Sequence, residues 1–469
     1  MPLDSTPQTA AVHTFYAPQA WVGGAWAQQV LLRVDAQGHW CEITPNAQAE
    51  QGATVLPGPV LPGVVNAHSH AFQRAIAGLT ERKSTGAAHA SDDFWSWRDR
   101  MYSAALRISP TQLEHIATQL YTELLAAGYT QVCEFHYLHN PVDASAIAQP
   151  LDMSLALVRA AQKVGLGLTL LPTLYMRSGF GAQGLRADQR RFASTPDSLL
   201  RLVQDLQVHT QEMPLVNVGV ALHSLRAASP DAIQEVAAHA AQEALPVHIH
   251  IAEQTQEVQD CLAHTGQRPI EWLLNHHALN SRWNLVHATH TTQAELQGVA
   301  ASGASIVICP STEANLGDGV FDYLGYTQAQ GTWSIGSDSH VTRSWSEELR
   351  LLEYSQRLTQ RKRNVAAQAA PADCLSTAGA LFDAALGGGT GASGQALAGI
   401  ALGQRADFQV LDSHAPSLLG VPVDYVLDAT LFSSPDTRPA AVYVAGKLAV
   451  NQSTDTADHY LAAMRALWV

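Results

Sequence analysis

Eight short apolar runs recur between residues 62 and 345, and longer amphipathic stretches separate them. The runs are rich in Val, Ile and Leu with little alternation of apolar and polar residues, which is typical of strands buried on both faces. They cover residues 63–68, 130–137, 166–175, 216–223, 246–253, 283–290, 305–311 and 333–340. Strands that alternate with helices over roughly 280 residues predict an α/β fold, a (β/α)8 TIM-like barrel. A doubly wound sheet is the alternative, but no GxGxxG segment follows an early strand.

The stretches between the runs carry helix signals. The segment "SPTQLEHIATQLYTELLAAG" offers Ser109 as N-cap, Pro110 at the first helical position and Gln112 to complete a capping box. Residues 231–245 and 346–361 show similar patterns. We therefore expect helices in these three intervals.

The two ends of the chain read differently from the middle. Residues 1–61 and 395–469 contain short β-rich segments such as "RADFQVLD", next to Gly- and Pro-rich stretches. We expect both ends to build one small β-sandwich domain, with a helix at the C-terminus, beside a barrel domain formed by residues 62–394. The uncharged, Gly-rich stretch 384–403 is interpreted as a loop. The interval 71–129 is unusually long for a barrel loop, which predicts a lid or a binding segment.

Composition excludes several classes of partner. The formal net charge of −14, with no long runs of Lys or Arg, argues against nucleic acid or an anionic membrane surface. No uncharged apolar run has the character of a membrane span, and the N-terminus lacks the basic-then-apolar order of a signal peptide. Five scattered Cys without a CxxC pair indicate reduced thiols. We expect a cytoplasmic protein without a membrane or nucleic-acid partner.

Residues that can bind a metal or move protons lie near the carboxyl ends of the predicted strands. They are His68 and His70 on strand one, His250 and Glu253 on strand five, His287 on strand six and Asp338 on strand eight. Residues two apart in a strand face the same side, and barrel active sites lie at this end of the strands. An H-x-H pair alone is weak evidence, because a chain with 21 His contains about one by chance.

The joint pattern is far more specific than any single residue in it. Three imidazoles and one carboxylate suit Zn²⁺ with a position left open for solvent. One carboxylate and one imidazole then remain to handle protons. The ordinary alternatives are that His248 is a core residue, that His290 belongs to a loop, and that Asp338 caps a turn.

Several segments resemble the amidohydrolase superfamily of metal-dependent hydrolases. "LPGVVNAHSH", "HIHIAE", "LVHATH", "CPSTEANLG" and "SIGSDSH" match its motifs on strands one, five, six, seven and eight, and "GQRADFQVLD" is similar to its C-terminal sandwich segment. Members with two metals usually carry a carboxylated Lys on strand four, but "VNVGVALHSLRA" has no Lys. The resemblance implies one divalent ion held by His68, His70, His250 and Asp338. Zn²⁺ suits this set best, and Fe²⁺ would accept it.

The same resemblance implies a hydrolytic mechanism. Glu253 would donate a proton to an imino nitrogen, and Asp338 and His287 would take the proton of the attacking water. The two acceptors are coupled, so the sequence does not divide this step between them.

Further segments resemble one branch of this superfamily. "HSHAFQRAIAGLTER", "DFWSWRDRMY", "CEFHYLHN", "LYMRSGFG" and "ALHSLRA" are similar to iminohydrolases that convert the formimino group of N-formimino-L-glutamate to a formyl group and ammonia in histidine degradation. That small-molecule substrate is a dicarboxylate, which an acidic protein must hold with local basic groups, and Arg binds carboxylates bidentately. The resemblance implies substrate contacts from Gln73, Arg98, Tyr137, His223 and Arg226, and a homodimer. Arg177 is a further candidate, and Trp95 and Trp97 are candidates for a lid.

Two other functions stay open. A related deaminase of guanine, cytosine or a triazine would act on a flat, neutral substrate and would need aromatic and amide groups rather than paired Arg. A catalytically inactive relative would be expected to lack some of the six metal and proton-transfer residues, and all six are present.

Overall fold

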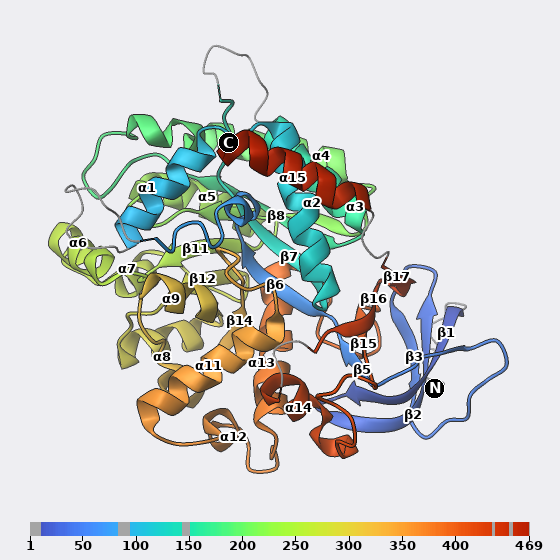
Figure 1. Ribbon diagram of the computed structural model, residues 1–469. Coiled ribbons are helices and arrows are strands. Elements are labelled where there is room, and N and C mark those ends of the chain that lie inside the picture. Colours follow the sequence, from blue (N-terminus) through green and yellow to red (C-terminus); the bar gives the residue numbers. More distant parts are fainter. Residues whose placement is uncertain (1–10, 83–93, 143–150, 434–436, 450–453, 469) are drawn as a thin grey trace, which may run out of the picture.

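The computed structural model describes residues 11–82, 94–142, 151–433, 437–449 and 454–468 (Figure 1). A parallel sheet curls into a barrel, and the order of its hydrogen-bonded strands is β14-β13-β12-β11-β10-β8-β7-β6, with β9 paired to β8. The strands are β6 (Val64–Ser69), β7 (Tyr129–His136), β8 (Gly167–Leu174), β9 (Val216–Val218), β10 (Val220–Leu222), β11 (Val247–Ile251), β12 (Trp283–His287), β13 (Ser305–Ile308) and β14 (Thr332–Ile335). All eight predicted runs are therefore strands, and the predicted α/β barrel is confirmed.

The fourth predicted run is divided at Gly219 into β9 and β10. A Cβ atom at this position would lie 2.7 Å from side-chain atoms of both Leu171 and Pro246, so only glycine fits between these neighbours. The first and last strands meet through Asp338, whose N–H donates to the His68 carbonyl at 3.0 Å. This contact brings the ends of β6 and β14 together at the mouth of the barrel.

Helices surround the barrel and include the three that the sequence predicts. Ser109 and Gln112 form the expected capping box at the start of α2, with a Gln112 N–H to Ser109 Oγ distance of 3.2 Å. The helices are α1 (Phe94–Ala105), α2 (Pro110–Ala126), α3 (Leu151–Val164), α4 (Pro196–Thr210), α5 (Pro230–Gln242), α6 (Thr255–Thr265), α7 (Pro269–His276), α8 (Gln293–Ser302), α9 (Pro310–Leu316), α10 (Tyr323–Gln328), α11 (Trp345–Gln360), α12 (Val365–Ala369), α13 (Thr377–Ser393), α14 (Val426–Phe432) and α15 (Thr454–Trp468). Short 3-10 helices are η1 (Ala71–Ala75), η2 (Ala187–Phe192) and η3 (Val423–Tyr425).

The predicted loop at 384–403 is wrong over its first half, because α13 continues to Ser393. Its glycines permit close packing rather than a break in the helix. A Cβ at Gly388 would collide with the Trp333 carbonyl, and one at Gly389 would lie 2.8 Å from Val65 Cβ. α13 therefore packs tightly against the amino-terminal ends of β6 and β14 and closes the bottom of the barrel.

A second sheet combines both ends of the chain, as predicted, and lies to one side of the barrel (Figure 1). Its order is β17-β16-β15-β5-β1-β2-β3, with β4 paired to β1. The strands are β1 (Ala11–Val22), β2 (Ala25–Asp35), β3 (Trp40–Thr44), β4 (Thr54–Val55), β5 (Val60–Pro62), β15 (Phe408–Leu411), β16 (Pro439–Val444) and β17 (Lys447–Leu448). The division into domains after residues 61 and 394 is retained as a proposal. Residues 1–10, on which the expectation about a signal peptide rests, lie outside the described part of the chain.

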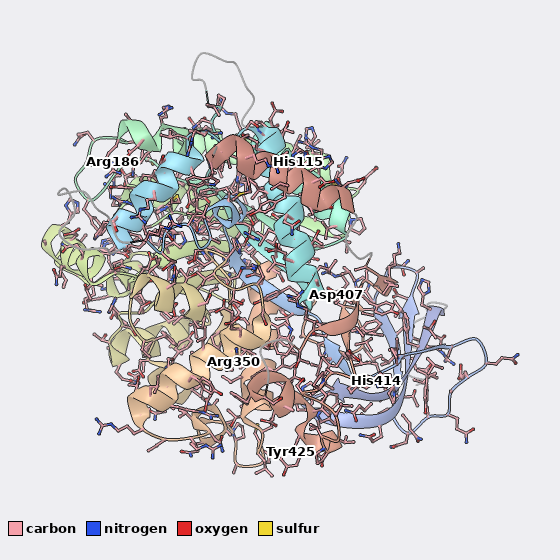
Figure 2. The ribbon with its side chains drawn as sticks, in the orientation of Figure 1. His115, Arg186, Arg350, Asp407, His414 and Tyr425 are labelled. Carbon is pink, nitrogen blue, oxygen red and sulfur yellow. The ribbon has the colours of Figure 1, made fainter. Side chains whose placement is uncertain are left out.

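Buried polar contacts join this sheet to the barrel near Asp407, which Figure 2 places between the two. Arg405 pairs with Asp407 at 2.6 Å and donates to the side chain of Gln131 on β7 at 2.9 Å. The N–H of Gly63 donates to the Asp407 carbonyl at 2.9 Å immediately before β6 begins. The sheet thus anchors the strand that carries the H-x-H pair. Among the described residues, no helix is both long and apolar enough to cross a membrane.

Candidate metal centre and active site

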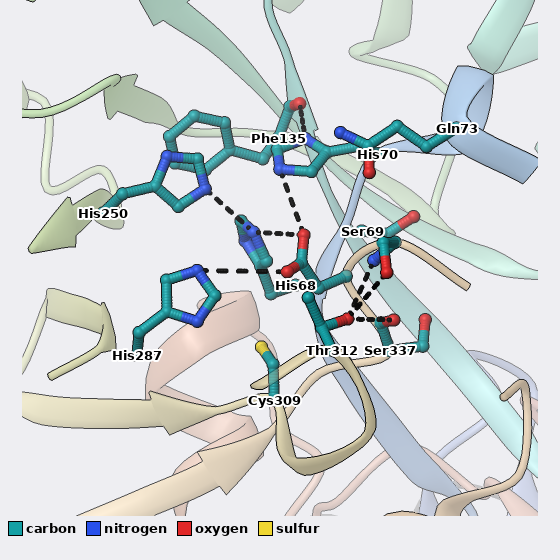
Figure 3. Close-up of polar contacts among 12 residues, drawn as sticks. His68, Ser69, His70, Gln73, Phe135, His250, His287, Cys309, Thr312 and Ser337 are labelled. Carbon is teal, nitrogen blue, oxygen red and sulfur yellow. Dashed lines mark hydrogen bonds and ion pairs between the residues drawn. The ribbon is translucent and has the colours of Figure 1, made fainter. Parts of the chain in front are cut away.

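Four of the predicted residues converge at the carboxyl ends of the barrel strands (Figure 3). His68 Nε2 lies 3.0 Å from His250 Nε2 and 3.3 Å from Asp338 Oδ1. His70 Nε2 lies 3.3 Å from the same carboxylate oxygen. All four side chains are buried. The proposed ligand set is therefore assembled from β6 and the residue that follows it, from β11, and from the loop after β14.

Backbone carbonyls fix which nitrogen of each ring faces the centre. His70 Nδ1 lies 2.8 Å from the Phe135 carbonyl, and His250 Nδ1 lies 3.0 Å from the His223 carbonyl. A carbonyl can only accept, so each Nδ1 carries the hydrogen and each Nε2 carries a lone pair. Such contacts to the far ring nitrogen are typical of histidines that bind metals.

The donor set fits a divalent cation. Two ligands about 2.1 Å from a tetrahedral ion lie about 3.4 Å apart, close to the observed separations of 3.0 and 3.3 Å. The lone pair on His250 Nε2 points at His68 Nε2, so a cation or a proton must lie between the two nitrogens. Three overlapping groups of buried donors can hold an ion: His68 with His70 and Asp338, His68 with His250 and His287, and His287 with Cys309 and Asp338. The residues present thus fit the one-metal site that the sequence predicts.

Electrostatics keep these ligands in the forms that bind metals. Burial lowers the pKa of His68 to about 3 and also lowers the pKa values of His70 and His250, so the imidazoles are neutral at physiological pH. Burial favours the protonated form of Asp338, but the hydrogen bond from His68 and the nearby imidazoles outweigh it and hold the pKa of Asp338 below its ordinary value. Neutral imidazoles and an ionised carboxylate are the forms that ligate a divalent cation.

The backbone at the site is held in unusual conformations. His287 has φ 71° and Asp338 has φ 45°, both in the left-handed region that non-glycine residues rarely occupy. Asn66 stabilises the loop of Asp338, because its side chain donates to Ser337 Oγ at 2.7 Å and accepts from the Ser337 N–H at 2.9 Å. Strained residues at active sites persist when such contacts over-determine them.

The two proton-transfer candidates lie beside this centre. His287 Nε2 is 3.7 Å from Glu253 Oε1 and 3.9 Å from Asp338 Oδ2. Burial raises the pKa of Glu253 to about 7, which suits a carboxyl group that exchanges a proton near neutral pH. Burial lowers the pKa of His287, but Glu253, Glu313 and Asp338 outweigh it and raise that pKa to about 10. A cation held by the neighbouring ligands would oppose this rise.

Sequence reasoning missed Glu313. Its Oε1 lies 3.5 Å from His287 Nδ1 and accepts from the Cys309 N–H at 3.0 Å. The signal was present in the strand-seven motif "CPSTEANLG", but the motif does not indicate that the glutamate side chain turns back toward strand six.

All five predicted substrate residues line one cavity together with the proposed catalytic residues. The lining includes Gln73, Arg98, Tyr137, His223 and Arg226, beside His70, His250, Glu253, His287 and Asp338. His68 lies behind this surface and is fully buried. The cavity therefore brings a metal-binding set, an acid and two guanidinium groups into one volume.

Each of the two arginines has a buried donor that makes no hydrogen bond within the described part of the chain. Arg98 Nε and Arg226 Nη1 are buried and have no hydrogen-bond partner among the described residues. Arg98 lies 4.4 Å above the Trp95 ring, and Arg226 lies 6.0 Å from the same ring. Arg226 Nη1 is 3.5 Å from Glu257 Oε2. Arg226 is only 9% exposed and Arg98 is partly buried.

Helix α1 contributes more of the wall than the sequence analysis assigned. Phe94, Trp97, Met101 and Tyr102 line the cavity beside Arg98. Their spacing of three and four residues places them on one helical face, so helical periodicity in "FWSWRDRMY" could have identified them. Within the predicted binding segment 71–129, α1 is the helix that lines the cavity. Trp97 contributes to it, whereas Trp95 packs on Arg98.

Arg177 does not line the cavity, so its candidacy as a substrate contact is wrong. Its Nε and Nη2 donate to the carbonyls of Arg226 and Leu225 at 3.1 and 3.0 Å.

His248 is a core residue, which was the alternative to a functional role. Its Nε2 lies 2.8 Å from the Ala392 carbonyl at the bottom of the barrel.

Comparison with known proteins agrees with this geometry. The amidohydrolase family model matches residues 60–449. A formimidoylglutamate deiminase of Pseudomonas aeruginosa is 47% identical over 435 residues, which cover 93% of this chain and 94% of the relative. A crystal structure of an amidohydrolase from Brucella melitensis superposes with a TM-score of 0.90 at 40% identity, covering 97% of this chain and all of that chain. An adenosine deaminase from Xanthomonas campestris with bound zinc shares the fold, with a TM-score of 0.79 at 22% identity and 98% of both chains covered.

The chain belongs to the amidohydrolase family. It carries buried His and Asp donors that could hold a metal ion.

Proposed function

We propose that this chain hydrolyses N-formimino-L-glutamate to N-formyl-L-glutamate and ammonia, a step of histidine degradation. One observation carries the proposal: the guanidinium groups of Arg98 and Arg226 line the same cavity as the metal-binding set, and the buried Nε of Arg98 has no hydrogen-bond partner among the described residues. Two guanidinium groups suit a substrate with two carboxylates. The 47% identity to a formimidoylglutamate deiminase over 93% of the chain supports the same substrate.

In the proposed site His68, His70, His250 and Asp338 hold one divalent ion. When bound, that ion would act as a Lewis acid that lowers the pKa of a water molecule, so that the water can give up a proton and attack near neutral pH. Asp338 and His287 lie on one side of the centre and accept the proton of the attacking water as a coupled pair.

Glu253 serves as the proton donor in this proposal. As water adds to the formimino carbon, Glu253 protonates the terminal imino nitrogen. A proton passed from Asp338 to the same nitrogen then completes the leaving group. The bond between carbon and that nitrogen breaks and ammonia departs, while the hydroxyl group on the carbon gives its proton to Glu253, which restores the acid and leaves the carbon as the formyl group. One water is consumed for each ammonia released, so atoms and charge balance.

The remaining residues bind and orient the substrate. Gln73 Nε2 donates to Tyr137 Oη at 3.1 Å, which leaves the phenolic hydrogen of Tyr137 free to donate to a carboxylate. Burial raises the pKa of Tyr137 well above its ordinary value, so the phenol keeps this hydrogen at neutral pH. His223 faces the cavity between Tyr137 and His250 and would contact the formimino group.

The second candidate function is deamination of a nucleobase-like heterocycle. The fold shared with an adenosine deaminase at 22% identity supports only the architecture. A flat neutral ring would bring no carboxylate to either guanidinium group, which would leave Arg226 with Glu257 alone and Arg98 without a carboxylate partner among the described residues. A buried charge without a partner disfavours binding.

Ammonia release tests the proposal. Metal-loaded protein is given N-formimino-L-glutamate, N-formimino-L-aspartate, guanine and cytosine in parallel. We expect release from N-formimino-L-glutamate and none from the two nucleobases. Release from a nucleobase alone would preserve the metal site and overturn the assignment of the pocket.

Zn²⁺ as the ion, a homodimer and a cytoplasmic location are further parts of the proposal. Native mass spectrometry combined with elemental analysis tests the first two.

A further inference from the structure

The backbone that carries Arg226 is held by a second arginine outside the cavity. Nε of Arg177 donates to the Arg226 carbonyl at 3.1 Å, and Nη2 donates to the Leu225 carbonyl at 3.0 Å. The backbone N–H groups of Met176 and Arg177 both donate to the Ala227 carbonyl, at 2.8 and 3.1 Å. Four donors from one short segment thus converge on three consecutive carbonyls.

These carbonyls belong to a tight turn between β10 and α5. The Ala227 N–H donates to the Ser224 carbonyl at 3.1 Å, which closes the turn around Leu225 and Arg226. The side chain of Arg226 enters the substrate cavity, whereas its carbonyl is bound by Arg177 on the other side of the turn. Fixing the carbonyl fixes the peptide plane and therefore the direction in which the Arg226 side chain leaves the backbone.

Arg177 has no other evident use for its charge. It forms no ion pair with any described residue, and burial lowers its pKa. Around it lie Phe180, Leu225 and Trp272, which line a cavity of about 220 Å³ separate from the substrate cavity. A partly buried cation without a counter-ion is costly unless hydrogen bonds compensate it, and here two backbone carbonyls do so.

We propose that Arg177 is a positioning residue that sets the direction of the Arg226 guanidinium and thereby the affinity for one substrate carboxylate. The inference rests on the proposed function for its substrate and on the observed turn for its geometry. Arg177 touches no substrate atom and acts only through Arg226. Its loss should weaken substrate binding and leave the chemical step intact.

Steady-state kinetics with N-formimino-L-glutamate tests whether Arg177 affects substrate affinity. For Arg177→Met we expect KM to rise about tenfold, within the range that a small misplacement causes, with kcat changed less than about twofold. Arg177→Lys keeps a donor for the carbonyls, so its KM should lie between those of the wild type and Arg177→Met. Arg190→Met is the matched control, because exposed Arg190 also donates to a backbone carbonyl, that of Ala187, but at a turn that carries no cavity residue.

A double-mutant cycle separates positioning from general destabilisation. Because Arg177 acts through Arg226, the double variant Arg177→Met with Arg226→Met should have the same KM as Arg226→Met alone. If the KM of the double variant rises by the product of the two single-variant factors, the inference is overturned. A loss of bound metal in Arg177→Met would also overturn it.

Hydrogen exchange gives a readout that does not depend on the substrate. Amides of residues 223–228 should exchange at least about tenfold faster in Arg177→Met than in the wild type or Arg190→Met, because the turn loses its restraints. Unchanged exchange would overturn the inference even if the wild type is active. If the wild type releases no ammonia from N-formimino-L-glutamate, the proposed function fails, and the exchange data still decide whether Arg177 holds the turn of Arg226.

Discussion

His68 Nε2 and His250 Nε2 face each other at 3.0 Å, although 182 positions separate the two residues in the chain. The Nδ1 atom of His250 donates to the His223 carbonyl, so its Nε2 presents a lone pair to His68. His250 thus adds a donor from a second strand to the H-x-H pair, which strengthens the case for a metal beyond the sequence motif.

The first prediction compares two histidines on one strand. His250→Ala should lower metal affinity by at least about 100-fold and abolish turnover, because it removes a ligand. His248→Ala is the matched control: His248 contacts the Ala392 carbonyl at the bottom of the barrel, so this variant should lose stability but keep its metal. Elemental analysis after dialysis checks both. Full metal content in His250→Ala would remove His250 from the ligand set.

Chelation should destabilise the wild type, because an ion that binds only the folded chain contributes to its stability. At 100 times the dissociation constant of the metal this contribution is about 2.7 kcal/mol. Thermal melts with a chelator should therefore show a Tm several degrees lower, which added Zn²⁺ restores. Identical melting curves with and without chelator would contradict a metal in this site.

Glu253→Gln should reduce kcat by about 10²- to 10⁴-fold and leave metal content unchanged, because the amide is nearly isosteric but cannot donate an acidic proton. Glu243→Gln, at an exposed position after α5, should have wild-type kinetics. Stopped-time ammonia assays on metal-matched samples provide the comparison. An unchanged kcat in Glu253→Gln would remove this residue from proton transfer.

Arg226→Met should raise KM at least about tenfold and change kcat little, because a lost carboxylate contact weakens ground-state binding. The KM of Arg226→Lys should lie between those of the wild type and Arg226→Met, since an ammonium group keeps the charge without the planar fork. Asp338→Asn should instead act mainly on kcat. If KM for N-formimino-L-glutamate stays the same in Arg226→Met, this arginine does not bind a carboxylate.

A pH prediction concerns the anchor of the loop that follows the H-x-H pair. Arg74 pairs with Glu123 at 2.9 Å. Burial disfavours ionised Glu123, but Arg74 outweighs this and lowers its pKa below 4.5. A depressed carboxyl pKa contributes stability above pH 4.5 that is lost as the pH falls through the folded-state value. The free energy of unfolding of the wild type should therefore exceed that of Glu123→Gln by on the order of 1 kcal/mol at pH 7. That advantage should shrink in melts below pH 4.5, with chelator in both samples; a constant advantage would contradict the pairing.

The barrel could be predicted because its strands are buried on both faces and appear as continuous apolar runs. The capping box at Ser109 and Gln112 is a local signal, and local signals survive folding. α13 could not be predicted, because the same glycines that mark a loop in the sequence here allow a helix to approach Trp333 and Val65. Only the packed structure distinguishes these two uses of glycine.

The candidate site followed from strand ends, where sequence position determines which face of the barrel a residue occupies. Residues placed by loops were harder to assign. Arg177 and Arg226 both follow barrel strands, yet only the side chain of Arg226 enters the cavity. Which way a loop side chain points depends on tertiary contacts such as those between Arg177 and the carbonyls of the Arg226 turn.

The most direct test is to identify which carbon–nitrogen bond breaks. N-Formimino-L-glutamate labelled with ¹³C at the formimino carbon is incubated with metal-loaded protein, and the products are followed by NMR together with an ammonia assay. We predict labelled N-formyl-L-glutamate and ammonia in equal amounts, because Glu253 protonates the terminal nitrogen. Labelled formamide with free glutamate, or no turnover, would contradict this prediction.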